Sequence, residues 1–138
     1  MKQLAVITAL LIALTSFRTA TIDSVDLYNV KWQLKSIHHK DEVSYIYTNA
    51  FVSFDETKKR ISGNGSCNTF GGSLEVKDNF IRFGQLFSTR MYCEQAQKIE
   101  TDFFAALSKV TRYEIKGNSL LLYQGEQLVL EFGSMNDN

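Results

Sequence analysis

The sequence of 138 residues contains no proline, only two cysteines and only two histidines. Without proline, repeats or low-complexity tracts nothing marks a linker, so we expect a single domain. There is no C-x-x-C or H-x-x-x-H pair, and the histidines are adjacent, at His38 and His39. These absences leave little basis for a zinc site, and the sequence predicts neither a metal nor a cofactor.

Long apolar runs are also scarce, and the one present covers residues 4–14. It is too short for a membrane-spanning helix, which needs about 20 apolar residues. A basic start precedes it and a polar segment ending at Ala20 follows, which is the order of a secretory signal peptide. We predict a signal peptide over residues 1–20, export to the periplasm or cell envelope, and no stable membrane span after cleavage. A buried N-terminal helix is the alternative.

An excess of charge of one sign is missing as well. The chain has 15 basic and 15 acidic residues, and removal of residues 1–20 takes away Lys2 and Arg18, leaving 13 basic residues against 15 acidic ones. A chain with a formal charge of −2 has no electrostatic attraction for nucleic acid or for an anionic membrane. We therefore expect neither as a partner.

What the chain does have is apolar residues in regular patterns. Alternation over residues 30–37 places Val30, Trp32 and Leu34 on one face of a strand, and residues 51–62 predict a hairpin with a five-residue turn. Over residues 94–110 the apolar spacing becomes i, i+4, i+7, i+8, which predicts a helix packed on the sheet, with Glu94, Glu100 and Asp102 toward its start as the helix dipole favours.

We therefore expect one domain over residues 25–133 that is mainly β with one α-helix (α+β). Its short strands and frequent turns predict a small antiparallel β-barrel or a strongly bent sheet. The predicted strands, about eight with a weaker one at 43–47, cover residues 30–37, 43–47, 51–54, 60–62, 73–76, 80–83, 111–115, 119–123 and 127–132.

Half of the eight glycines lie within residues 63–72, around Cys67. A phosphate-binding P-loop would need a lysine after its last glycine and a helix behind it, whereas Gly72 is followed by Ser73 and a predicted strand. The dinucleotide fingerprint fails too, because Asn68 stands where its third glycine belongs. We instead expect these glycines to provide positive φ angles and close strand approach at a bend.

Cys67 and Cys93 permit two interpretations. A nucleophilic thiol would need a base within reach, and the only histidines, His38 and His39, lie in a predicted polar loop. In an exported protein the cysteines favour a disulfide, which would close a loop of about 27 residues and add about 3–4 kcal/mol of stability. Two buried free thiols are the alternative to the disulfide. A thiol-dependent redox protein or enzyme using Cys67 or Cys93 is the alternative function.

Several short motifs follow one another in the order of a known family. Residues 32–34 are W-Q-L, residues 63–68 are G-N-G-S-C-N with Gly72 beyond, and residues 89–93 are T-R-M-Y-C. With the helix and two closing strands that follow, this series resembles the META/HslJ-like domain over residues 30–132.

The resemblance implies a mostly antiparallel, β-barrel-like fold with one helix in an exported or envelope-associated protein linked to stress tolerance. It also implies no catalytic activity and no cofactor. The partner would be an unknown envelope protein or a small ligand, and we expect a monomer; an inhibitor or adaptor of another envelope protein is a further alternative. We expect Asn68 to order the turn through its side chain. The other motif residues would be structural, namely Trp32, Gly63, Gly72, Thr89 and Met91.

Overall fold

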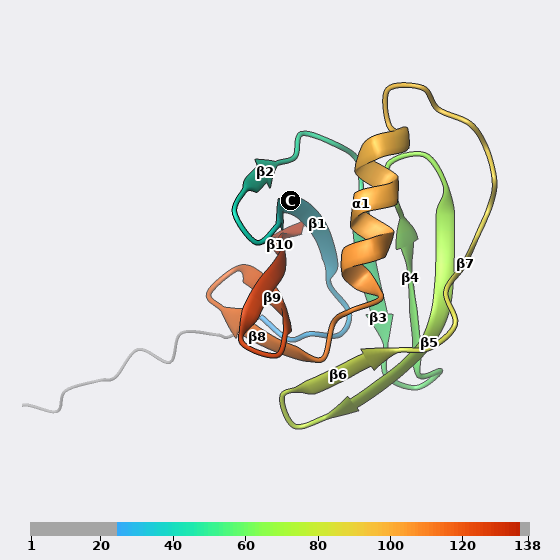
Figure 1. Ribbon diagram of the computed structural model, residues 1–138. Coiled ribbons are helices and arrows are strands. Elements are labelled where there is room, and N and C mark those ends of the chain that lie inside the picture. The colour runs from blue at the N-terminus through green and yellow to red at the C-terminus, as the bar shows by residue number, and fades with distance from the viewer. Residues whose placement is uncertain (1–24, 136–138) are drawn as a thin grey trace, which may run out of the picture.

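The computed structural model describes residues 25–135, in which ten strands and one helix form (Figure 1). The predicted signal peptide over residues 1–20 lies outside the described residues. The elements are β1 (Lys31–His38), β2 (Val43–Tyr45), β3 (Phe51–Asp55), β4 (Arg60–Asn64), β5 (Thr69–Lys77), β6 (Phe80–Phe83), β7 (Phe87–Ser88), α1 (Gln97–Leu107), β8 (Arg112–Lys116), β9 (Ser119–Gln124) and β10 (Gln127–Met135).

All ten strands belong to one sheet whose pairings form a ring. The order is β10–β9–β8–β6–β5–β4–β3–β1, and β1 pairs in turn with β10. Each pairing is antiparallel, and the short strands β2 and β7 are attached to β1 and β5. The ring is thinnest between β6 and β8, where Phe80 opposite Arg112 is the one pair described. The predicted α+β class and antiparallel architecture are confirmed. The strands form a ring that is joined between β6 and β8 by few strand pairs.

The ring encloses a single apolar core. Successive strand residues face opposite sides, so Trp32 and Leu34 of β1 both point inward and are fully buried. Nε1 of Trp32 donates to the carbonyl oxygen of Leu27 at 3.0 Å, which satisfies the one polar group of the indole. Trp32 therefore acts as a core residue.

Helix α1 lies between the β1–β10 side of the sheet and the side that carries β4, β5 and β7 (Figure 1). Phe103 holds it there through edge-on contacts with Phe132 of β10 and Phe70 of β5, with ring centroids 6.2 and 5.8 Å apart. No helix within residues 25–135 is long and apolar enough to cross a membrane.

Two predicted boundaries change in the structure. The helix spans Gln97–Leu107 rather than residues 94–110, because residues 94–96 form turns before it. The glycine-rich run is largely strand, since β4 continues to Asn64 and β5 already begins at Thr69. The predicted hairpin of β3 and β4 is confirmed, with Phe51 opposite Asn64, but its turn is residues 56–59 and not the predicted five residues, because Asp55 already pairs with Arg60.

Candidate functional site

A disulfide joins Cys67 to Cys93, with Cα atoms 5.9 Å apart and a sequence separation of 26. Cys67 lies in the connection between β4 and β5, and Cys93 precedes α1. The carbonyl oxygen of Cys93 accepts hydrogen bonds from the N–H groups of Ala96 and Gln97 at 3.0 and 2.9 Å. The bond therefore fixes the start of α1 to the β4–β5 connection, and it is the pairing that the sequence predicts.

The side chain of Asn68, next to the disulfide, is buried and uses all of its polar groups. Its Oδ1 accepts from the Thr89 hydroxyl at 2.8 Å and from the Met91 N–H at 2.7 Å. Its Nδ2 donates to the Met91 carbonyl oxygen at 3.1 Å and to Oε1 of Glu100 at 2.6 Å. The amide thus pairs with the Met91 backbone much as a neighbouring strand would. This pairing explains why the Cys-Asn and Thr-x-Met motifs occur together.

Glu100, in the first turn of α1, completes the cluster and is only 4% exposed. Its Oε2 accepts hydrogen bonds from the backbone N–H groups of Cys67 and Asn68 at 3.1 and 2.6 Å. Successive N–H groups in a turn form an anion-binding concavity. The glycine-rich connection therefore does bind an anion, and this anion is a carboxylate of the same chain. We call the disulfide together with the hydrogen-bonded groups of Asn68, Thr89, Met91 and Glu100 the clasp.

The backbone of the β4–β5 connection is shaped to receive this carboxylate. A Cβ on Gly65 would lie 2.8 Å from Oε2 of Glu100, so a side chain there would crowd the carboxylate. The Gly65 N–H donates to the carbonyl oxygen of Asn68 at 2.8 Å and closes the turn. Between them Ser66 takes a φ of 103°, an uncommon angle for a residue with a side chain. Its N–H donates to Oδ1 of Asn64 at 2.8 Å, which supports that conformation.

Gly63 and Gly72 are strand residues that allow close approach of neighbouring segments. A Cβ on Gly63 would overlap the carbonyl oxygen of Phe51, and one on Gly72 would lie 2.7 Å from the Leu86 side chain. The predicted positive φ angles for the glycines of this run are wrong: Gly63, Gly71 and Gly72 have strand geometry, and in the connection the positive φ belongs to Ser66 instead of Gly65. Among the described residues the glycines with positive φ are in hairpin turns, at Gly117 and Gly125.

The sequence motifs contain every residue of the clasp except Glu100. Trp32, which belongs to the same series of motifs, lies in the core and not in the clasp. From the sequence, Glu100 is expected only to interact with the helix dipole at the start of the helix. A signal was nevertheless present, because Glu100, Phe103 and Leu107 are spaced i, i+3, i+7 and therefore share one helix face. The structure buries all three. An acid at an apolar position of a helix indicates an internal hydrogen-bonding partner.

The His38 side chain has its polar contacts on β1 and β10. Nε2 of His38 lies 2.9 Å from the Ser36 hydroxyl and 3.8 Å from a carboxylate oxygen of Glu131. Among the described residues no hydrogen bond joins a histidine to a cysteine, and both sulfurs are in the disulfide. Residues 25–135 also contain no group of three or more His, Cys, Asp or Glu side chains placed to hold a metal ion.

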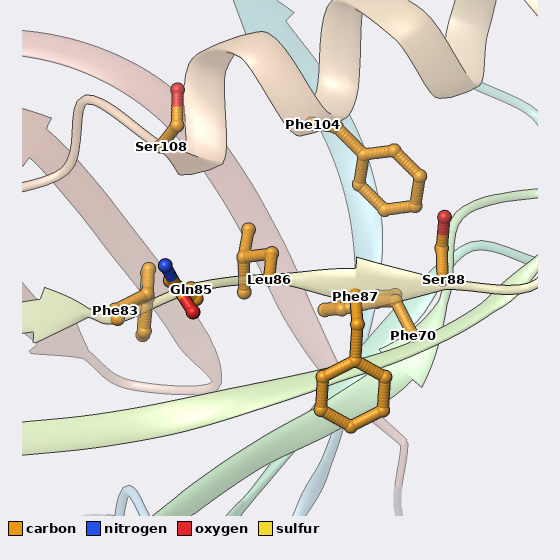
Figure 2. A pocket seen from close by; sticks show the side chains of 9 residues that line it. Phe70, Phe83, Gln85, Leu86, Phe87, Ser88, Phe104 and Ser108 are labelled. Carbon is orange, nitrogen blue, oxygen red and sulfur yellow. The ribbon is translucent and has the colours of Figure 1, made fainter.

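Beside the clasp, a cavity of about 400 Å³ separates α1 from residues 84–88 (Figure 2). A second depression of about 370 Å³ shares Ser88 and Phe104 with it and continues to Thr89, Met91 and Glu100. The two form one groove along α1. Its apolar part is lined by Phe70, Phe83, Leu86 and Phe104, with the hydroxyls of Ser88 and Ser108 nearby.

Comparisons with known proteins agree with this fold. A family model described as the META domain matches residues 25–136. An NMR structure of a protein from Burkholderia xenovorans is 23% identical, with 80% of this chain and 84% of that chain covered and a TM-score of 0.67. A DUF4847 family protein from Bacteroides vulgatus is 14% identical, with 78% and 94% covered and a TM-score of 0.55. These structural similarities show a shared fold alone. No curated protein sequence matches the chain significantly.

Proposed function

This chain belongs to the META domain family, and we propose that it is an exported protein of the cell envelope that acts by binding a partner, in a role in stress tolerance. The observation that carries the proposal is the Cys67–Cys93 disulfide. Disulfides persist in oxidising compartments and are rare in the cytosol. Together with the signal-like segment at residues 4–14, the disulfide favours export.

Binding rather than catalysis is favoured by how the clasp uses its polar groups. Catalysis needs a nucleophile, acid or base free to meet the substrate. In the clasp, the Asn68 amide and the Glu100 carboxylate bond to the chain itself. The two cysteines are joined to each other. These groups therefore support a structural role for the clasp, in which it fixes α1 and residues 89–93 beside the groove.

Export is tested by expressing the full chain and a variant lacking residues 1–20 in a bacterial host and separating the periplasm from the cytoplasm. We expect the full chain in the periplasm without its leader, and the shortened variant in the cytoplasm. The exported protein should resist alkylation and should have a mass about 2 Da below that of the reduced chain, the mark of one disulfide. Recovery of the full chain from the cytoplasm with two alkylated cysteines would refute the proposal.

The partner is sought by crosslinking in intact cells and mass spectrometry. A photoreactive residue in place of Tyr92, which is 78% exposed beside the groove, should capture a partner. The same residue in place of Lys116, an exposed position on β8, is the matched control. Equal capture at both positions would argue against a binding site at the groove.

A further inference from the structure

Two strands of the described sheet, β2 and β7, have a partner on one side only, and β7 is the one beside the apolar cavity. Strand β7 pairs with β5 and with no other strand of the described residues. In an antiparallel pair every second residue directs its backbone N–H and C=O groups toward the partner strand, and the residues between direct theirs away. The Thr89 N–H donates to the carbonyl oxygen of Thr69, and the Met91 N–H donates to Oδ1 of Asn68. The backbone N–H and C=O groups of Ser88 and Arg90 therefore point away from β5, along an open edge.

The open edge adjoins the apolar cavity. Leu86 and Ser88 point toward α1, which carries Phe104, whereas Phe87 points away (Figure 2). Because successive residues of a strand face opposite sides, a strand added beside β7 would present every second side chain on the face of Leu86 and Ser88. That face opens into the cavity of about 400 Å³ lined by Phe70, Phe83 and Phe104.

Exposed apolar side chains gather on the same segment. Of the eight large hydrophobic side chains exposed in the described residues, three lie within residues 87–92. Phe87 is 59% exposed, Met91 59% and Tyr92 78%. Grouped apolar exposure of this kind marks an interaction surface. A second group of three lies within residues 43–47, but the group at 87–92 is the one beside the cavity of about 400 Å³.

From these three observations we propose that the groove between α1 and β7 binds an extended peptide segment of a partner protein by strand addition. The peptide backbone pairs with Ser88 and Arg90, and one aromatic or branched aliphatic side chain enters the cavity. Main-chain pairing supplies affinity in such complexes and the side-chain pocket supplies specificity. The inference rests on the proposed binding function and identifies its partner chemistry.

An extended peptide fits the site better than the sheet edge of a second copy. Phe104 of α1 and Ser108, which directly follows the helix, line the wall opposite β7, so the space is closed on two sides. A volume of about 400 Å³ is that of a small-ligand pocket. It has room for the anchoring side chain of a single extended chain.

The test uses the purified full chain and a phage-displayed library of short random peptides as the probe. We expect enriched sequences with an aromatic or branched aliphatic residue between polar ones. Ser88→Pro removes an N–H group that points away from β5 and leaves the bonds to β5 intact. It should lower the affinity for synthetic versions of the enriched peptides at least about tenfold. The matched control is Tyr45→Pro on β2, the other strand with a partner on one side only, and it should leave affinity within about twofold.

Two measurements on the unaltered protein keep the test independent of whether Ser88→Pro folds. Peptide binding should slow amide hydrogen exchange at Ser88 and Arg90 but not at Thr89 and Met91, which are already bonded. N-methylation of the even-numbered peptide positions and of the odd-numbered ones should have different effects, because only one row of N–H groups faces β7. One pattern should abolish binding and the other should preserve it.

Three results would overturn the inference. These are a library without enriched peptides, binding that slows no exchange at Ser88 and Arg90, or a dimer in sedimentation that Ser88→Pro dissociates. The last result would assign the edge to a second copy. Peptide binding by the purified protein does not depend on export, so a cytoplasmic location would refute the proposed function alone. An exported protein that captures a partner but binds no peptide would refute this inference alone.

Discussion

The two connections on either side of β4 have the same length but are stabilised by different interactions. Residues 56–59 join β3 to β4, and residues 65–68 join β4 to β5. Each contains one residue other than glycine with positive φ, Lys59 at 50° and Ser66 at 103°. In the first connection Oδ1 of Asp55 accepts the Lys58 N–H at 2.8 Å. That turn is closed by neighbours in the sequence.

The second connection is stabilised largely by distant residues. Glu100 binds the N–H groups of Cys67 and Asn68 from 33 and 32 positions away, and Thr89 reaches Asn68 from 21 positions away. The β4–β5 connection therefore couples the sheet to α1 and to the groove, whereas the β3–β4 connection reaches beyond its own hairpin only to the next strand, through the Leu74 N–H of β5 that donates to the Lys59 carbonyl oxygen at 2.9 Å. Four variants test this difference.

The largest effect is expected from Glu100→Ala. This variant leaves the N–H groups of Cys67 and Asn68 and the Asn68 amide without their acceptor in a buried place, which should lower the free energy of unfolding by about 4 kcal/mol. The matched control is Glu56→Ala in the β3–β4 connection, where the side chain is exposed. Urea denaturation measures both. A Glu100→Ala variant as stable as Glu56→Ala would show that the distant carboxylate does not support the turn.

Loss of the disulfide should have the next largest effect. The double variant Cys67→Ala, Cys93→Ala should lose about 3 kcal/mol, because the unfolded chain regains the freedom of the closed loop. Amide exchange should rise at Cys67 and Asn68 and stay unchanged at Lys58 in the other connection. Reduction of the unaltered protein with dithiothreitol is the control and should give a similar loss. Unchanged exchange at Asn68 would mean that the hydrogen bonds of the clasp suffice without the covalent bond.

Thr89→Val should have a smaller effect of about 1 kcal/mol. Valine keeps the shape of threonine but removes the hydroxyl that donates to Oδ1 of Asn68, and one hydrogen bond contributes about this much. Thr57→Val, an exposed threonine of the β3–β4 connection, is the control and should change little. Thermal or urea unfolding of the pair gives the comparison, and equal stabilities would contradict it.

The smallest effect is expected at Asp55. The Lys58 N–H that it accepts lowers the pKa of its carboxyl below the ordinary value of 3.8, with the Lys58 charge contributing less. A lowered folded-state pKa gives stability that is present above 3.8 and is lost as pH falls through the folded value. Asp55→Asn should therefore lower Tm slightly at pH 7, by about 2 °C, and not at all in strong acid. Identical Tm values at pH 7 would contradict this prediction.

The difference between the two connections also explains what the sequence could predict. The β3–β4 hairpin follows from alternation on both sides of a polar turn, and the structure has it. The alternation of β1 and the helical spacing around Phe103 likewise depend on neighbouring residues. These local patterns predict the class of the fold and, within residues 25–135, the helix and all but one of the strands.

What the local patterns miss depends on contacts between distant segments. Glu100 is an ordinary helical acid until the fold places it against the N–H groups of Cys67 and Asn68. Strand β7 has only two residues, Phe87 and Ser88, too few for a periodic pattern. The glycine-rich run reads as a turn because glycine favours turns, yet Gly63 and Gly72 are in strands where neighbouring groups leave no space for a side chain.

The sequence by itself determined the antiparallel α+β architecture, the apolar core and the motif that contains both cysteines, because apolar period and motif spacing are properties of the chain. Only the tertiary structure decided what the glycine-rich connection binds and that a groove forms beside it. Both depend on α1, because its Glu100 carboxylate binds the β4–β5 connection and its Phe104 side chain lines the groove. A helix and a sheet meet in that way only after the chain has folded.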